Sequence, residues 1–476
     1  MPVRTGGRTS FGKSGARHRA VAFAFLVGCL ASVFLRATPA GPFRTTAAFA
    51  APPTPVFAAP PTADPFPELK EKKKPKRALT PLESAAAQAA ATLRGGSGVI
   101  ANPDAVEFAL WLYGEAGRAA DRDRAARLAR ELAKAGLENG SVASLFRVAQ
   151  AGGSTLREAE DGFRKRQEAL AGVETLASEP YAALVLDVFA RAGAVALPQA
   201  MEEALFATGN FWQLRTRKEG PSIRVFAADG TPETLAGHGA ALRVGLEGAS
   251  LSGSPAFREE CRMLAHEILR RFWDEDSERF RDATAGGAAG DAGAASASEA
   301  ARDAKVAGAA GAAKSVGTAG GSAASNALRE NARAALAVWE IGIVCGDALL
   351  RGRGQRALEG ALLESLKDPQ AVAAVGLAAG RMAGHPVEMA LVGDPGEPTL
   401  VELRQAAYCL FEPSRVILNL DPAVDAARFA ELLYPPDLAP ALFVCVETLC
   451  SPPIEKADGL AAQVREIRKL AAAAAN

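Results

Sequence analysis

The spacing of apolar residues predicts helices along most of the chain between residues 80 and 385. Apolar side chains recur there at intervals of three and four, the pattern of a helix with one packed face. The predicted helices cover residues 106–116, 122–135, 156–171, 181–192, 198–207, 235–248, 256–273, 327–350, 355–366 and 369–382. The first of these reads VEFALWLYGEA and is apolar on most sides, so we expect it to be buried.

Short turns rich in Gly, Pro or Ser separate these helices, which arrive in pairs. The series begins at Thr80-Pro81-Leu82-Glu83, which combines an N-cap threonine, a proline at the first helical position and a capping-box glutamate. Stacked antiparallel pairs form either an open solenoid or a closed toroid. No repeat of fixed period favours the solenoid.

Two stretches interrupt the helical pattern. Residues 211–214 and 222–228 are predicted to form a small hairpin, with Asp229-Gly230 as its turn. Residues 283–325 consist largely of Ala, Gly and Ser, a composition that cannot support a core. We therefore expect a disordered insertion there.

The pattern changes after residue 385. Continuous apolar runs at 387–392, 415–420 and 441–446 alternate with helical sequence at 398–410, 423–433 and 458–473. Such runs are typical of buried parallel strands. Residues 386–476 are thus either an appended α/β module or an α/β segment packed against the end of the helical domain, and we predict that they close it.

The N-terminus has the layout of a targeting sequence. Residues 1–19 are basic, 20–35 are uninterrupted apolar residues, and Ala40 is a candidate cleavage point. Sixteen residues span about 24 Å as a helix, which is short for a membrane span, although a retained signal anchor is the alternative.

A segment rich in Ala and Pro and without Asp or Glu follows at 41–63. Within it, residues 47–52 (AAFAAP), centred on Phe49, resemble the motif of bipartite presequences in algae with secondary plastids. We predict that residues 1–63 are a signal and transit presequence and that 64–79 are a linker. A simple secretory leader, which would send the protein to the endomembrane system or outside the cell, is the alternative.

Composition limits the partners of the chain. Its 476 residues are 49% hydrophobic, enough for a sizeable core, and carry 54 basic and 54 acidic residues. All seven Lys and Arg residues before Asp64 fall in the presequence, so the remainder has 47 basic residues against 54 acidic ones. We expect neither a nucleic-acid partner nor, once the presequence is removed, a membrane.

The cysteines do not predict a disulfide framework or a metal site. Five of the six lie beyond the leader, without regular spacing. Cys445 and Cys450 end the last strand, where we favour buried thiols over a disulfide. No further ligands stand nearby to complete a zinc site, and no cofactor motif is present.

The closing sequence at 441–454, ALFVCVETLCSPPI, resembles the C-terminus of the spermatogenesis-associated, thioredoxin-domain-containing family. Weaker matches occur in the same order at 272–282, 325–331, 392–394 and 413–416. This resemblance implies an (α/α) six-hairpin toroid related to sugar 2-epimerases. The family's thioredoxin-like domain has no counterpart here, since the chain lacks Cys-x-x-Cys, so the predicted fold is mainly α, an incomplete toroid with a small α/β segment.

His238 is the candidate for proton transfer, because it stands between glycines at a helix start that would face the central cavity of a toroid. The alternative is a structural histidine, since no partner base can be named. His266 is expected to be structural and His385 exposed.

Two functions are open. The first is a non-catalytic scaffold or interaction protein, favoured because the family's interior motifs are eroded in this chain. The second is a carbohydrate enzyme of the sugar 2-epimerase or six-hairpin glycosidase type. The expected ligand is accordingly either a protein or a sugar.

Overall fold

The computed structural model describes residues 78–95, 100–136, 140–170, 198–227, 230–281, 323–432 and 440–474. The predicted presequence, the helix at 181–192, most of the linker and residues 283–322 of the predicted insertion lie outside these ranges. In the described part, no helix is both long enough and apolar enough to cross a membrane.

The helical region begins at α2 and extends to α14. Its helices are α2 (Pro81–Gly95), α3 (Pro103–Ala116), α4 (Ala119–Ala135), α5 (Ser141–Gln150), α6 (Leu156–Leu170), α8 (Pro198–Arg215), α9 (Leu235–Ser252), α10 (Pro255–Phe272), α12 (Ala323–Cys345), α13 (Ala348–Ser365) and α14 (Val372–Ala383). The predicted mainly α fold is confirmed. Helix α5 was not predicted, and α12 begins within the predicted insertion and ends earlier than expected, at Cys345, where Gly346 adopts φ +68°.

Local capping explains where several helices start. Asn102 accepts a hydrogen bond from the backbone N–H of Ala105 at 2.8 Å, and Pro103 follows it at the first helical position of α3. Ser254 and Pro255 repeat this combination at α10. A capping oxygen satisfies a free N–H of the first turn, and proline already has the helical φ, so both junctions are fixed by sequence.

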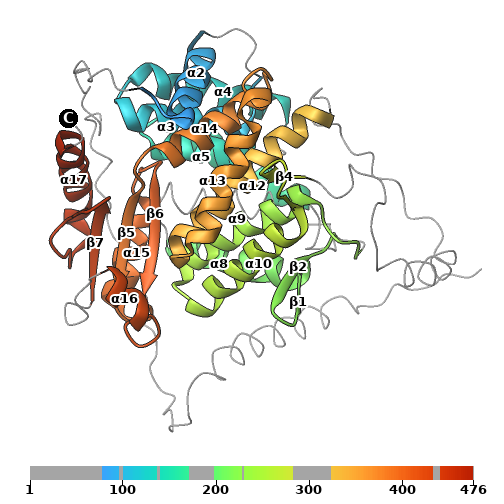
Figure 1. The fold of residues 1–476 in the computed structure, drawn as a ribbon. Coiled ribbons are helices and arrows are strands. Elements are labelled where there is room, and N and C mark those ends of the chain that lie inside the picture. The colour runs from blue at the N-terminus through green and yellow to red at the C-terminus, as the bar shows by residue number, and fades with distance from the viewer. Residues whose placement is uncertain are drawn as a thin grey trace, which may run out of the picture. The chain divides into compact units, whose positions relative to one another are not determined.

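The helices pack as an inner row with outer partners, and Figure 1 shows α12 beside α13 and α9 in the middle of the helical region. The closed or incomplete toroid stays a prediction. In the inner row α3 lies between α5 and α14, and α12 lies between α14 and α9. On the outer side α2 packs against α14, α4 against α3, α10 against α9, and α13 against α12. The inner row therefore runs in the order α5, α3, α14, α12 and α9, with α14 at its centre.

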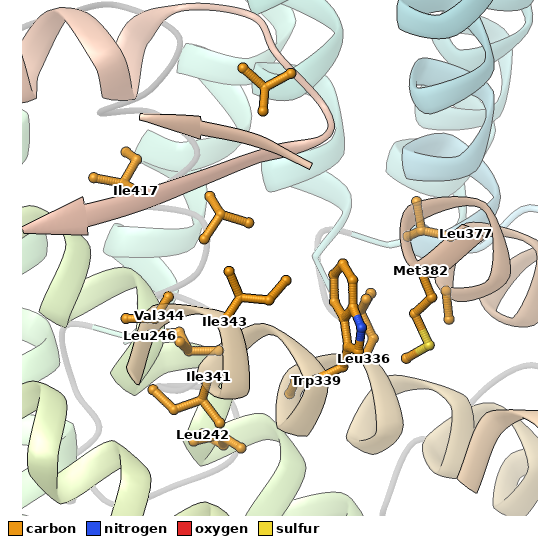
Figure 2. Close-up of a cluster of buried hydrophobic side chains, with 14 of the residues drawn as sticks. Leu242, Leu246, Leu336, Trp339, Ile341, Ile343, Val344, Leu377, Met382 and Ile417 are labelled. Carbon is orange, nitrogen blue, oxygen red and sulfur yellow. The ribbon is translucent and has the colours of Figure 1, made fainter. Parts of the chain in front are cut away.

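An apolar core surrounds α12. Figure 2 shows Leu242 and Leu246 of α9 beside Ile341 and Val344 of α12, with Ile417 of the C-terminal segment approaching the same cluster. On the other side of α12, Leu336 and Trp339 lie toward Leu377 and Met382 of α14 (Figure 2). Burial of these side chains fixes α9, α12 and α14 to one another.

The small hairpin exists, but its predicted first strand was wrong. Residues 211–214 belong to α8, where Trp212 packs edge-on against Phe257 of α10 with ring centroids 4.9 Å apart. The strands are β1 (Thr216–Glu219) and β2 (Ser222–Val225), joined at Gly220, which has φ +61°. A second short pair, β3 (Trp273–Asp274) and β4 (Arg279–Phe280), follows α10.

The C-terminal segment is a four-stranded sheet with helices. Its elements are β5 (Val387–Val392), α15 (Pro398–Cys409), β6 (Arg415–Leu420), α16 (Ala426–Leu432), β7 (Ala441–Val446), β8 (Leu449–Cys450), the 3-10 helix η3 (Ala457–Gly459) and α17 (Leu460–Ala474). The strand order is β6-β5-β7-β8. Only β5 and β6 are parallel, so the expectation of three parallel strands was wrong: β7 is antiparallel to β5. The apolar runs report burial and not strand direction.

Cys445 and Cys450 form a disulfide, so the preference for free thiols was wrong. The two residues are direct cross-strand partners of β7 and β8, with Cα atoms 4.1 Å apart. A tight turn between the strands, with Glu447 at φ +54°, places them opposite each other. Among the described cysteines, Cys261, Cys345 and Cys409 take part in no disulfide.

Candidate active site

A cavity of about 130 Å³ lies between the inner helices and the segment that joins α15 to β6. Each of α3, α5, α9, α12 and α14 contributes residues about one helical turn apart, and the remaining wall comes from α15, β6 and their connection. The helical contributions are Glu107 and Leu110, Arg147 and Gln150, Arg243, Leu246, Glu247 and Ser250, Glu340 and Val344, and Leu377 and Arg381. The other wall includes Tyr408, Phe411, Glu412 and Arg415.

The cavity is lined by both apolar and charged side chains. Leu246, Val344, Leu377 and Ile417 line it and also belong to the core cluster of Figure 2. On the helices, a charged lining residue stands about one turn from each apolar one: Arg243 from Leu246, Glu340 from Val344, and Arg381 from Leu377. The packed core thus holds each charged residue in a fixed direction.

These charged residues were not predicted from the sequence, although three of them leave a visible signal. Glu107 interrupts the otherwise apolar run of α3, Glu340 that of α12, and Arg381 that of α14. A charged side chain is costly on a buried helix face unless it is paired or reaches water. A lone charge in an apolar helix therefore indicates a polar interior space.

Three arginine–glutamate pairs organise the wall. Arg243 Nη2 donates to both carboxylate oxygens of Glu107, at 2.7 and 2.9 Å. Arg381 Nη1 lies 2.6 Å from Glu340 Oε1, in contact but without hydrogen-bond geometry. The third pair is longer: Arg147 Nη2, on α5, lies 3.6 Å from Glu247 Oε1. The six side chains remain between 17% and 35% exposed, so water reaches the cavity.

Tyr408 joins the C-terminal segment to this network. Its hydroxyl donates a hydrogen bond to Glu247 Oε2. Gln150 Nε2 donates to the backbone carbonyls of Tyr408 and Cys409 at 3.2 and 2.9 Å, and Arg415 Nη1 donates to that of Tyr408 at 2.6 Å. The last carbonyls of a helix have no partner within it, and these contacts supply partners at the end of α15. They hold Tyr408 over the cavity.

The carboxyl groups that line the cavity differ in their acidity. Burial raises the pKa of Glu340 above its usual value, and the neighbouring carboxylates of Glu247 and Glu107 raise it further, against the opposing guanidinium groups. Burial also disfavours ionisation of Glu107 and Glu247, but nearby guanidinium groups outweigh it and lower the pKa of both. Burial raises the pKa of Tyr408 well above its usual range, which keeps its hydroxyl protonated. Burial raises the pKa of Glu412 as well, against the guanidinium of Arg468. The site therefore combines two carboxyl groups of raised pKa with two of lowered pKa.

His238 does not line this cavity. It is fully buried in the first turn of α9, where Nδ1 lies 2.9 Å from the Thr234 carbonyl and Nε2 is 3.4 Å from the backbone N–H of Val225. This arrangement fits a neutral ring that donates through Nδ1 and accepts through Nε2. Burial lowers the pKa of His238 to about 4, with Arg271 adding to the effect. Its catalytic role stays a prediction.

The other two candidate histidines lie elsewhere. His266 is half-buried on α10 and contacts Asp347 at 2.8 Å, whereas His385 is exposed and contacts Glu447 at 2.7 Å. Among the residues described here, no three His, Cys, Asp or Glu side chains are grouped so that they could hold a metal ion.

No family model matches the chain, and no curated protein matches it either.

Proposed function

We propose that the protein is an acid–base enzyme that acts on a small polyhydroxy compound of about the size of one sugar ring. The observation that carries this proposal is the pair of Glu340 and Glu247 in one water-accessible cavity, with pKa values moved in opposite directions. Environments that separate the pKa values of two carboxyl groups prepare one as an acid and the other as a base.

The volume limits the substrate to one ring. The cavity holds about 130 Å³, and an engineered cavity of about 150 Å³ in another protein accepts benzene. The charged lining residues supply hydrogen-bond donors and acceptors for hydroxyl groups. The apolar lining residues Leu246, Val344 and Leu377 supply apolar contacts for a ring face. A monosaccharide-sized compound matches this combination.

Glu340 is the proposed general acid, because its raised pKa favours the protonated form that can donate to a substrate oxygen. Glu247 is the proposed base. Its Oε2 accepts from Tyr408, while its other oxygen makes a 3.6 Å contact to Arg147 and no hydrogen bond to the residues that the structure describes, so it is open to accept a proton. Glu107 is a weaker candidate, since Arg243 occupies both of its oxygens.

The test is turnover of a panel of free monosaccharides and simple glycosides, followed by chromatography of the products. We expect Glu340→Gln to lower turnover by about 10²- to 10⁴-fold, the usual contribution of a general acid. Glu330→Gln is the matched control, because Glu330 lies on the same helix but outside the cavity. The scaffold hypothesis predicts no turnover by any variant, and such a result with folded protein would contradict the proposal.

We also propose that the chain is a divergent relative of the spermatogenesis-associated, thioredoxin-domain-containing family and that residues 1–63 deliver it to a secondary plastid. The support is the ordered set of C-terminal motifs and the acid-free leader. Fusion of residues 1–63 to a fluorescent protein, expressed in an alga with such a plastid, tests the destination. Fluorescence confined to the endomembrane system would favour the secretory alternative.

A further inference from the structure

Arg415 differs from the other arginines that line the cavity. Arg147, Arg243 and Arg381 each face a glutamate within 4.0 Å. Within the described part of the chain, Arg415 has no carboxylate at ion-pair distance. Its hydrogen bonds there run from Nη1 to the carbonyls of Tyr408 and Leu410, at 2.6 and 2.8 Å. Its Nε and Nη2 atoms have no hydrogen-bond partner among these residues.

The position of Arg415 makes the missing counter-charge significant. Its guanidinium lies over the Tyr408 ring, 4.8 Å from the centroid, at the wall of the cavity. Arg147 is close enough to disfavour its charge further. Burying two neighbouring cations costs free energy unless an anion compensates them, and Glu247 is the carboxylate that faces both. One positive charge therefore remains without a partner beside the space for a ligand.

Arg404 shows that an unpaired buried arginine is not enough for this inference. It is 5% exposed and also lacks a carboxylate partner in the described structure. However, its Nε donates to Asn419 Oδ1 and its Nη2 to the Pro395 carbonyl, both at 3.0 Å, and it does not line the cavity beside Arg415. The hydrogen bonds of Arg404 are internal, whereas Arg415 keeps free donors beside an open space.

We propose that Arg415, assisted by Arg147, binds an anionic group of the substrate, which makes the substrate class a sugar acid or a sugar phosphate. This inference rests on the proposed function for the sugar part, but the anion site stands on the arginine geometry alone. The planar guanidinium fork matches the oxygens of a carboxylate or a phosphate. The apolar residues and the remaining polar residues that line the cavity would then contact the neutral part of the ligand.

Calorimetric titration of the wild-type protein separates the two sources of the anion. The probes are glucuronate and galacturonate for the carboxylate, glucose 6-phosphate for the phosphate, and glucose and galactose as neutral matches. We expect at least one anionic sugar to bind about tenfold or more tighter than its neutral match, as a hydrogen-bonded charge pair provides. Equal affinity for anionic and neutral sugars would overturn the proposal.

Acetate and inorganic phosphate test the anion site without the sugar. Arg415-dependent binding of either, with no binding of any sugar, would keep the anion site but contradict the sugar substrate. Binding of anionic sugars by Glu340→Gln without turnover would support both proposals. Wild-type protein that binds none of these anions overturns the inference, whatever the turnover experiment shows.

The variants Arg415→Gln and Arg415→Lys separate charge from structure. We expect Arg415→Gln to abolish the preference for the anionic sugar and Arg415→Lys to retain part of it, since lysine keeps the charge but not the fork. Arg164→Gln, on an exposed side chain of α6, is the control and should bind as the wild type does. If Arg415→Gln keeps the full anionic preference while remaining folded by circular dichroism, Arg415 is not the anion site.

Discussion

Helix α9 carries two ionisable groups of opposite character, the fully buried His238 in its first turn and the partly exposed Glu247 farther along. The ring of His238 has a backbone partner at each nitrogen and packs edge-on against Phe272, with centroids 5.2 Å apart. Glu247 also has partners, Tyr408 and Arg147, but these come from other elements around a cavity that water enters. On one helix, His238 is therefore enclosed by protein, whereas Glu247 borders a cavity that water enters.

This difference shows what a titratable residue needs for chemistry. Burial, with Arg271 adding to it, lowers the pKa of His238 to about 4, yet the ring does not line the cavity described above. The pKa of Glu247 is lowered by guanidinium groups that line the same cavity as Glu247 and Glu340. A perturbed pKa is thus informative about function mainly where a cavity and more than one charged group accompany it.

Replacement of His238 by alanine should cause the largest loss of stability of the changes considered below. The change removes the contacts of the ring with the Thr234 carbonyl and the Val225 N–H and leaves a buried cavity. Together these losses lower the free energy of unfolding by about 2–4 kcal/mol. Urea unfolding measures this loss. His385→Ala, at a 56% exposed side chain, should change stability by about 1 kcal/mol or less. Loss of turnover by folded His238→Ala, without loss of stability, would contradict the comparison and restore His238 as a catalytic residue.

The stability contributed by the neutral His238 ring should also depend on pH. The unfolded state has the ordinary pKa of 6.5 and takes up the proton first, whereas the folded ring has a pKa of about 4. Stability is therefore greatest above pH 6.5 and falls as the pH drops toward 4, by up to about 3 kcal/mol. Unfolding of the wild type and of His238→Gln, measured at several pH values, isolates this part. Parallel profiles of stability against pH for the two proteins would show that the folded state does not lower the pKa of the His238 ring.

A third site, the disulfide, tests whether the far side of the terminal sheet affects the cavity. Reduction of Cys445–Cys450, or the double change to serine, opens a loop between cysteines five residues apart and should cost about 2 kcal/mol. Strands β7 and β8 do not line the cavity, so turnover should stay within about twofold of wild type. A loss of turnover that matches the loss of Glu340→Gln would instead place the sheet in control of the site.

Much of the fold was readable from the sequence because local patterns determine it. The strands at 387–392, 415–420 and 441–446 match the predicted bounds, since each apolar run stops at a turn signal. The first hairpin strand was misplaced because α8 continues through residues 211–214 to bury Trp212. The direction of β7 depends on which neighbour it pairs with, and the run ALFVCV carries no information about that.

The site was less predictable, for a physical reason. The charged residues Glu107, Glu247 and Glu340 interrupt apolar stretches of the sequence, but they lie far apart along it and on three different helices. Whether they share a space depends on how α3, α9 and α12 rotate and pack, which local periodicity does not specify. A search for lone charges in apolar helices finds the candidates, and only the packing brings them together.

The smallest expected effect is the stability change of Glu340→Gln, and its sign is the useful part. A raised folded pKa means that the fold disfavours the ionised carboxyl, so the wild type loses stability as the pH rises above 4.5, whereas the neutral amide does not. Glu107→Gln should show the opposite trend, because the pKa of Glu107 is lowered and its charge stabilises the fold as the pH rises. Thermal unfolding of both variants against wild type, from acid to neutral pH, gives the two slopes. Slopes of the same sign would mean that these carboxyl groups are not held in opposite states, which removes the basis for assigning Glu340 as the acid.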